Sequence, residues 1–373
     1  MQVIIAVNTA NPYAAQHSVV SNPVYRSLER WAEKHPLDEI HFLFDGPVLK
    51  ELITRSNFKG TGIRAPGFFR AGYDFRQADL LRKLKPDMIL NTGGVCVMRT
   101  SIPQILMLPE LSFIDHPGLL PKKQVSLVKK AMMRSVKKAS VIISPSAYSQ
   151  QLISANYQLA DTPVRVIVPV PDAEYRSIDQ RTREDVKEKF AEGREFYLFR
   201  GSIEPGNDLF NLLKAFSLFK KRQKTNMLLL IAPAGGIGLN DMREKLMSFK
   251  FRQDVKVLES LSLYDRASIT GAAYGFVYPA LYADHALPQM EAIQCGIPVI
   301  TCNTGAIGEQ CGESALYARP ADMNDLAEKM MLLFKNEDAR KDLIRNGQDR
   351  AKEFNIDVFD DGLREVVMQC MNQ

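Results

Sequence analysis

Three side chains that could act on a sugar or a nucleotide lie close together in the stretch LYADHALPQMEAIQCGIPVI, residues 281–300. Asp284 and His285 stand in a loop, and Glu291 follows in the first turn of a short helix that we expect to begin near Leu287. The N–H groups at the start of a helix can bind a phosphate, because they are unpaired and the helix dipole is positive there. A carboxylate at Glu291 would then accept hydrogen bonds from the hydroxyls of a ribose.

Each of these residues also has an ordinary structural interpretation. Glu291 could merely complement the positive end of its own helix. His285 could move a proton or bind a sugar hydroxyl, or it could be an exposed loop histidine. Asp284 is an alternative to His285 as the group that approaches a sugar. The residues alone leave these alternatives open.

A second loop with related chemistry follows the strand predicted in YLFRGSIEPGNDLFNLLKAF, residues 197–216. Gly201 ends the strand, and a turn from Ser202 to Asn207 leads into an amphipathic helix. Side chains at positions i and i+2 of a strand share a face, so Arg200 lies on the same face as Ser202. Arg200 therefore reaches this site or, alternatively, pairs with a carboxylate in the sheet.

Short apolar runs alternate with helical stretches throughout the chain and must position these loops. The runs are continuous rather than alternating with polar residues, which is typical of strands buried on both faces of a parallel sheet. The predicted strands are QVIIAV, EIHFLF, MILNTG, QILML, SVIISP and RVIVPV in the first half and FYLFRG, NMLLLIAP, DVKVLE, YGFVYP and IPVITC in the second.

The strand–helix alternation occurs twice, which predicts an α/β protein with two Rossmann-like, doubly wound domains facing a cleft. The break falls in the charged, turn-rich stretch 169–190, where we expect the hinge. The predicted domains are residues 1–172 and 173–355, and residues 356–373 form a helix that packs back on the first domain. In such a protein the cleft between the domains is the expected binding site.

The composition is that of a globular protein without a membrane span. The chain has 373 residues, of which 46% are hydrophobic and 24% charged, and no apolar run is long enough to cross a bilayer. The amino-terminal residues MQVIIAV indicate a buried strand rather than a signal peptide. The five cysteines show no pairing pattern, which favours a reducing, cytoplasmic location. The five histidines do not cluster, so no metal site is expected.

The net charge of +5 comes partly from a basic stretch at residues 122–140. A solvated helix face is the ordinary interpretation. The alternative is a patch that rests on anionic lipid or meets a polyanionic substrate. Aromatic residues are not interleaved with the cations, which argues against nucleic acid. The residues that would make a peripheral membrane contact are Lys129, Lys130, Arg134, Lys137 and Lys138, with Lys122 and Lys123 nearby.

Three segments of the second half resemble the nucleotide-sugar-binding domain of the retaining glycosyltransferases of family 4, which have the GT-B fold. GSIEPGNDLFNLLKAF is similar to the family's strand–Gly–helix pattern, and PALYADHALPQMEAIQCGIPVI is similar to its Glu-Gly-Phe-Gly-Leu-Pro-x-x-Glu pattern. NTGAIGEQCGESALYARPADMNDLAEKM continues the likeness to the final helices. In the first half, LPELSFIDHPGLLP and ASVIISPSAYSQQLI match more loosely.

Four polar landmarks of the family are altered in this chain, and one is kept. The two cations that hold the donor diphosphate in the family fall on Ser202 and Asn207, and the first glutamate of its pair falls on Ala283. The family's His-Asp falls on Pro109-Glu110, and its second glutamate is kept as Glu291. A hydrogen bond to a charged group contributes about 1.5–3 kcal/mol, so two lost cations cost roughly 3–6 kcal/mol of phosphate binding.

The resemblance implies a metal-independent, retaining glycosyltransferase with a degenerate donor site, acting in polysaccharide or glycoconjugate synthesis. Its substrates would be a nucleotide sugar and a glycan acceptor, and no cofactor is expected. Glu291 would hold the donor ribose, the 202–207 amides and Leu287 the phosphates, and His285 or Asp284 the sugar. The alternative is a non-catalytic homologue, acting as the partner subunit of another protein or as a glycan-binding module.

Overall fold

The computed structural model describes residues 2–10, 22–63, 70–108, 110–159, 161–233 and 239–371. The chain divides into two compact units. Unit 1 comprises Met1–Pro169 together with Ile356–Gln373, and unit 2 comprises Val170–Asn355. The chain therefore passes from unit 1 to unit 2 three residues before the boundary that the sequence predicts, and it returns to unit 1 at residue 356.

Unit 1 is built on a parallel sheet that has seven strands in the described part of the chain. Their order is β3-β2-β1-β4-β5-β6-β7, which is doubly wound with a reversal between β1 and β4. The central strands are buried except for the partly exposed Met107 at the end of β5, and this explains their largely apolar sequences. The strands are β1 (Ile4–Asn8), β2 (Glu39–Asp45), β3 (Phe58–Ile63), β4 (Met88–Asn91), β5 (Gln104–Met107), β6 (Val141–Ser144) and β7 (Val164–Val166).

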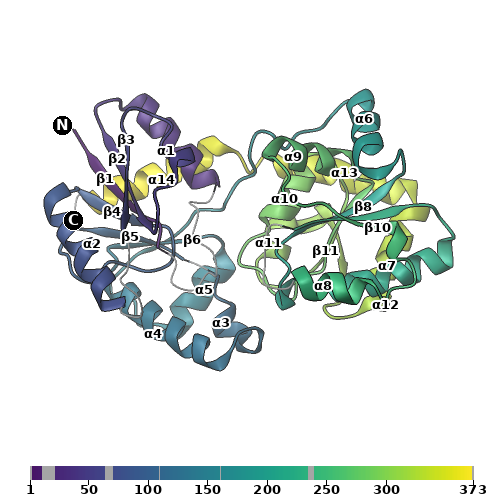
Figure 1. Ribbon diagram of the computed structural model, residues 1–373, viewed down its shortest axis with the longest axis horizontal. Coiled ribbons are helices and arrows are strands. Elements are labelled where there is room, and N and C mark those ends of the chain that lie inside the picture. The colour runs from purple at the N-terminus through teal and green to yellow at the C-terminus, as the bar shows by residue number, and fades with distance from the viewer. Residues whose placement is uncertain are drawn as a thin grey trace. The chain divides into compact units, whose positions relative to one another are not determined.

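The helices of unit 1 include the last helix of the chain, α14, which packs against α1 and β5 (Figure 1). Arg30 of α1 joins the two helices through ion pairs with Asp357, at 2.5 Å, and Asp360, at 2.9 Å. The expected return of the carboxyl-terminal helix is thus seen within this unit. Its helices are α1 (Asn22–Lys34), α2 (Arg70–Leu84), α3 (Ser112–Asp115), α4 (Lys122–Lys138), α5 (Ala147–Asn156) and α14 (Ile356–Met371), with 3-10 turns η1 (Lys50–Leu52) and η2 (Pro117–Leu119).

Unit 2 repeats the same winding. Its described strands form a parallel sheet in the order β10-β9-β8-β11-β12-β13, with the reversal between β8 and β11. In each sheet, the first three strands of the chain are added one after another from the centre towards one edge. The remaining strands are added from the centre towards the other edge. The strands are β8 (Phe196–Gly201), β9 (Leu228–Pro233), β10 (Val255–Val257), β11 (Gly275–Tyr278), β12 (Val299–Cys302) and β13 (Ala315–Ala318).

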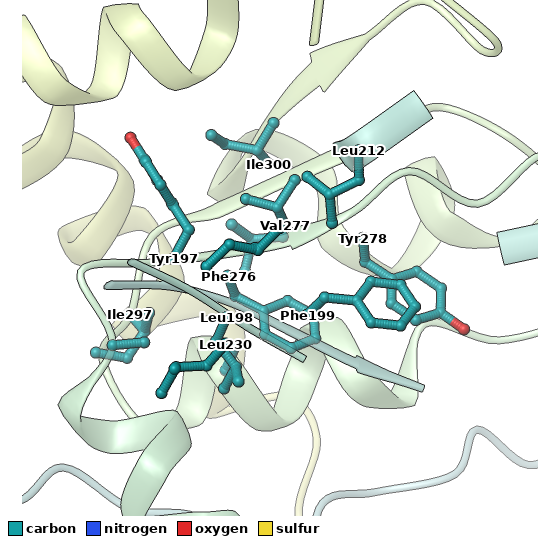
Figure 2. Packing of buried hydrophobic residues seen from close by; sticks show 14 of the residues in the cluster. Tyr197, Leu198, Phe199, Leu212, Leu230, Phe276, Val277, Tyr278, Ile297 and Ile300 are labelled. Carbon is teal, nitrogen blue, oxygen red and sulfur yellow. The ribbon is translucent and has the colours of Figure 1, made fainter. Parts of the chain in front are cut away.

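Helices cover both faces of this second sheet. In Figure 1, α7, α8 and α12 lie on one side of the strands, and α9, α10 and α13 lie on the other. Aromatic and branched side chains from both faces fill the core, which Figure 2 shows around Phe199 and Phe276. The helices and turns are α6 (Gln180–Ala191), α7 (Leu209–Gln223), α8 (Leu239–Leu246), α9 (Leu263–Ala272), α10 (Leu287–Gln294), α11 (Ile307–Cys311), α12 (Met323–Lys335), α13 (Glu337–Ala351), η3 (Pro205–Asn207), η4 (Arg252–Asp254) and η5 (Gly312–Ser314).

No helix in the described part of the chain is long and apolar enough to cross a membrane. The chain's five cysteines are all free, and all are buried. Burial raises the pKa of four of these thiols, those of Cys96, Cys295, Cys302 and Cys311, to about 12, so they are protonated at neutral pH.

Candidate functional site

The two candidate loops of unit 2 meet where the winding of its sheet reverses. β8 and β11 are neighbouring strands, and Phe276 lies opposite Leu198. Gly201 ends β8 and Tyr278 ends β11, so the loop after each strand leaves from the same edge of the sheet. Ligands of open parallel sheets bind outside the carboxyl ends of the strands at this reversal. The fold therefore places both predicted loops at one candidate site.

Ser202 and Asn207, which replace the two cations of the family pattern, hydrogen-bond to each other. The Asn207 side-chain amide donates to the Ser202 carbonyl at 2.8 Å and to its Oγ at 2.9 Å. The hydroxyl of Tyr278 donates to Asn207 Oδ1 at 2.9 Å. The loop between β8 and α7 is thus closed by uncharged side chains. This arrangement supplies neither of the positive charges that a diphosphate needs.

Gly201 allows the end of β8 to approach the Tyr278 ring closely. A Cβ atom at this position would lie 2.6 Å from Cε2 of Tyr278, which is too short for a non-bonded contact. The Tyr278 ring in turn stacks on Phe199, with ring centroids 5.5 Å apart (Figure 2). The hydroxyl that binds Asn207 is therefore held by the aromatic core.

The loop before α10 is fixed by contacts with the segment after β12. The Ala283 carbonyl accepts a hydrogen bond from the N–H of Ala306 at 2.9 Å. Gly305 has a φ of +55°, and a Cβ there would lie 2.1 Å from that carbonyl oxygen, so glycine is required for this contact. Gln310 accepts a hydrogen bond from the N–H of Ala286 at 2.6 Å. These contacts fix the loop that carries Asp284 and His285.

Helix α10 begins at Leu287, which makes Glu291 its fifth residue. The expectation that Glu291 lies in the first turn is therefore wrong, because Leu287-Pro288 are already helical; proline is favoured there since it lacks an N–H. The N–H of Leu287 is bound by Nδ1 of His285 at 3.3 Å. Gln289 is the next residue with an N–H, and that N–H has no partner among the described residues. A phosphate here would meet few open donors.

Arg200 forms a buried ion pair with Glu291. Nη2 of Arg200 donates to Oε2 of Glu291, and the guanidinium lies over the ring of Tyr175, 5.0 Å from its centroid. Arg200 and Glu291 are only 9% and 8% exposed. The carboxylate that Arg200 meets is thus on α10 rather than in the sheet. The alternative that Arg200 pairs with a carboxylate is confirmed, although that carboxylate is not in the sheet, and the alternative that Arg200 reaches a ligand site stays a prediction.

The protonation of this pair reflects both burial and attraction. Burial raises the pKa of the Glu291 carboxyl, and the positive charges of Arg200 and then Arg266 oppose that rise. Burial by itself would lower the pKa of Arg200, but Glu291 and Tyr175 outweigh it, and the net change is upward. Arg200 is therefore charged and is the main group that favours an ionised Glu291.

His285 is partly buried in its loop rather than exposed. Burial lowers the pKa of its imidazole to about 4, so the ring is neutral at pH 7. Because Nδ1 accepts the hydrogen bond from Leu287, the proton of the neutral ring resides on Nε2. His285 can therefore donate a hydrogen bond through Nε2 but is a weak base. Asp284 is buried and accepts a hydrogen bond from the Tyr282 hydroxyl at 2.7 Å, so part of its carboxylate is used within the protein.

Unit 1 carries a buried chain of amide side chains at the reversal point of its own sheet, which the sequence analysis missed. Asn8 ends β1 and Asn91 ends β4, and they hydrogen-bond at 2.9 Å. Gln77 donates to Asn8 at 2.9 Å, and Asn91 donates to Gln104 at 3.0 Å. Gln104 also binds both backbone groups of Val97 and so holds the loop after β4. The asparagine at the end of the apolar run in MILNTGG, residues 88–94, is the sequence feature that could have indicated this polar cluster.

The remaining sequence predictions concern residues outside these two places. Pro109 lies outside the described residues, and Glu110 is exposed. The predicted cations of α4 are exposed at Lys129, Lys130, Arg134 and Lys137, whereas Lys138 is partly buried. Within the described ranges, no three histidine, cysteine, aspartate or glutamate side chains come together as metal ligands would.

Residues 180–350, which lie within unit 2, match the family model described as "Glycosyl transferases group 1". Across a longer stretch, the chain is 25% identical over 291 residues to O-antigen chain mannosyltransferase B of Escherichia coli. That match covers 77% of this chain and 75% of the relative. The family match includes both candidate loops of unit 2.

Solved structures of similar fold extend over nearly the whole chain. Sucrose-phosphate synthase from Thermosynechococcus elongatus superimposes with a TM-score of 0.80 at 14% identity, covering 99% of each chain. HepE of Anabaena, solved in complex with UDP and glucose, gives a TM-score of 0.77 at 14% identity and covers 99% of this chain and 100% of its own. At these identities the likeness establishes the fold, and both units take part in it.

Proposed function

We propose that this chain, whose residues 180–350 match the glycosyl transferases group 1 model and whose fold is that of the solved two-domain structures, transfers a hexose from a nucleotide-activated donor to a glycan acceptor. The transfer would retain the anomeric configuration and need no metal ion, as the likeness to family 4 implies. The similarity to a mannosyltransferase of O-antigen synthesis supports polysaccharide or glycoconjugate assembly as the setting. Unit 2 would bind the donor and unit 1 the acceptor.

Glu291 would accept hydrogen bonds from the ribose hydroxyls of the donor. Nε2 of His285 would donate to a hydroxyl of the hexose, since the neutral ring has its proton there. Asp284 would support the loop through Tyr282. The amides of the 202–207 loop and the N–H of Gln289, near Leu287 whose own N–H is bound by His285, would face the diphosphate, whose leaving charge must be stabilised in the transition state.

A degenerate donor site is the consequence of Ser202 and Asn207. These two side chains bind each other and Tyr278, and they carry no charge. We therefore expect weak binding of unmodified nucleotide sugars and slow transfer. Submicromolar binding of GDP-mannose or UDP-glucose to the unaltered protein would contradict this expectation.

The observation that carries the proposal is the position of Glu291 at the reversal point of the second sheet. It is tested by isothermal calorimetry with GDP-mannose and UDP-glucose, comparing the unaltered protein with Glu291→Gln. Loss of a charged hydrogen bond should weaken binding by about 1.5–3 kcal/mol. Glu328→Gln is the control, because it makes the same chemical change at an exposed residue of another helix, α12. It should leave the affinity for the nucleotide sugars unaltered.

Unchanged affinity in Glu291→Gln would remove the support for a donor site. The alternative, a non-catalytic homologue that acts as a partner subunit or glycan-binding module, would then be preferred. It is supported by the same uncharged loop, because a binding protein has no leaving group to stabilise. Transfer of labelled mannose or glucose to a glycan acceptor by the unaltered protein would exclude this alternative.

We further propose that α4 makes a peripheral contact with an anionic lipid surface. Its sequence contains no acidic residue, and its buried side is formed by Val128, Met132, Ser135 and Val136. Lys123, Leu127, Lys130, Arg134 and Lys137 follow one another at helical spacing and are all exposed. Leu127 is 65% and Met133 46% exposed. Apolar side chains among cations favour a lipid surface over a soluble polyanion.

The buried, free cysteines support the expectation of a reducing, cytoplasmic location. A glycosyltransferase that meets lipid through α4 would then work at the inner surface of a membrane.

A further inference from the structure

Arg200 is a charged residue near the end of a buried central strand. It is the fifth residue of β8, and its side chain reaches α10, where Nη2 donates to Oε2 of Glu291. The Tyr175 ring covers the guanidinium, and Tyr175 is itself buried. Charges buried to this degree require a partner of opposite sign. Each member of the pair is thus needed to keep the other charged.

Building on the proposed role of Glu291, we infer that Arg200 is a positioning residue of the donor site. It holds the Glu291 carboxylate in its ionised form and fixes it through Oε2, so that Oε1 accepts the hydrogen bonds of the donor ribose. Oε1 has no partner among the described residues, and Glu291 keeps a small exposed area. Arg200 itself would not touch the ligand.

The other charged and titratable groups around Glu291 do not replace Arg200. Arg266 of α9 favours the ionised carboxyl less strongly, and Asp172 opposes it. Tyr175 and Cys295 lie beside the pair, but burial raises the pKa of each to about 12, so both are neutral. Burial already has the largest effect on the pKa of Glu291, so removing the Arg200 charge would take away the main influence that opposes it and shift Glu291 further towards the protonated form.

A competing interpretation predicts the opposite effect of removing Arg200 on nucleotide affinity. If the ion pair merely occupies Glu291, then ribose must displace Arg200, and removal of Arg200 would tighten nucleotide binding. If Arg200 positions Glu291, its removal weakens binding, most of all at low pH. A protonated carboxyl is a weaker acceptor than a carboxylate, so affinity in the variant falls as pH falls through the raised pKa.

The test is calorimetric titration with GDP-mannose at pH 6 and pH 8 of the unaltered protein and of Arg200→Met, Arg200→Gln and Arg200→Lys. The diphosphate of this probe does not titrate in that range. Arg200→Met should lose more affinity between pH 8 and pH 6 than the unaltered protein does, by up to about tenfold for each pH unit below the raised pKa, since one protonation changes a population tenfold per pH unit. Arg200→Lys should restore the flatter profile because it restores the charge.

Arg200→Gln keeps hydrogen-bonding capacity without charge and should behave as Arg200→Met does, which covers the case that the methionine variant fails to fold. Arg222→Met, at an exposed arginine of α7, serves as the control and should follow the unaltered protein. Circular dichroism establishes that each variant is folded before titration. Glu291→Gln combined with Arg200→Gln should show no additional pH dependence, because the titrating carboxyl is gone.

Two results would overturn the role of Arg200 alone: tighter binding by the uncharged variants, or a pH profile that they leave unchanged while Glu291→Gln still weakens binding. If the unaltered protein binds no nucleotide sugar, or if Glu291→Gln has no effect, the proposed donor site fails as well. The glutamate variant thus separates failure of the site from failure of the arginine's role.

Discussion

At the scale of single residues, Ser202 and Asn207 are expected to decide how strongly the proposed donor site can hold a diphosphate. Their side chains already face each other across the loop, with 2.9 Å between Asn207 Nδ2 and Ser202 Oγ. Ser202→Arg combined with Asn207→Lys would place two cations there. We expect GDP-mannose to bind more tightly by up to roughly 3–6 kcal/mol, about 1.5–3 kcal/mol for each charged hydrogen bond, measured by calorimetry.

Part of that gain would be offset, because the Tyr278 hydroxyl loses its acceptor on Asn207. A control must carry the same added charge elsewhere in unit 2, and Gln348→Arg with Gln223→Lys provides it. If this control tightens binding as much as the loop variant does, the effect is general attraction of an anion and not restoration of a site.

The ion pair also changes what Glu291→Gln is expected to do to stability. A glutamate at a helix terminus would contribute about 0.3–1 kcal/mol. Glu291 lies beyond the first turn and faces Arg200, whose charge would be left buried without its partner. Breaking a buried pair costs about 3–5 kcal/mol, so thermal melts must accompany every affinity measurement on this variant. The sequence could name Arg200 and Glu291 separately, but their pairing depends on contact between a strand and a helix 91 positions apart.

At the scale of elements, the exposed cations of helix α4 predict binding to an anionic lipid surface. Lys130→Glu with Arg134→Glu reverses two adjacent cations of its exposed stripe. Each basic residue near an anionic membrane contributes about 1 kcal/mol, so reversal of two should weaken vesicle binding by at least ~2 kcal/mol, or about thirtyfold. Co-sedimentation with vesicles of phosphatidylglycerol and phosphatidylcholine measures this loss.

Lys221→Glu with Arg222→Glu is the matched control, since it reverses two exposed cations near the end of α7 in unit 2. It changes net charge equally and should bind vesicles as the unaltered protein does. Equal loss in both variants would show attraction by net charge alone. Binding that persists in pure phosphatidylcholine would contradict an anionic surface as the partner.

The elements that the sequence failed to predict are two edge strands. β3 and β13 lie at the outer ends of their sheets; β3 has exposed positions that interrupt its apolar run, whereas β13 is a run of only four residues, two of them alanines, which are poor strand formers. β3 also contains two glycines, which weaken a strand signal. The central strands were predictable because burial on both faces demands continuous apolar sequence. In the same way, family landmarks placed the loops of the site, but the hydrogen bonds among Ser202, Asn207 and Tyr278 required coordinates.

At the scale of the whole molecule, the two units should respond separately to loss of core packing. Leu363 of α14 is buried in unit 1, and Leu343 of α13 is buried in unit 2. Leu363→Ala and Leu343→Ala should each cost about 2–5 kcal/mol. Hydrogen exchange read by mass spectrometry should show lost protection in unit 1 for the first variant and in unit 2 for the second. Equal loss across the chain in both would contradict two separately stable units.

The position of α14 also sets an order of events on the ribosome. Unit 1 needs this helix against α1 and β5, yet the helix is synthesised only after all of unit 2. At about 5–20 residues per second, unit 2 takes on the order of ten to forty seconds to emerge. Throughout that interval, the strands of unit 1 present an apolar surface that its last helix will later cover. The amino-terminal part is made first but is completed last, and during that interval its uncovered apolar surface is one that a chaperone could bind.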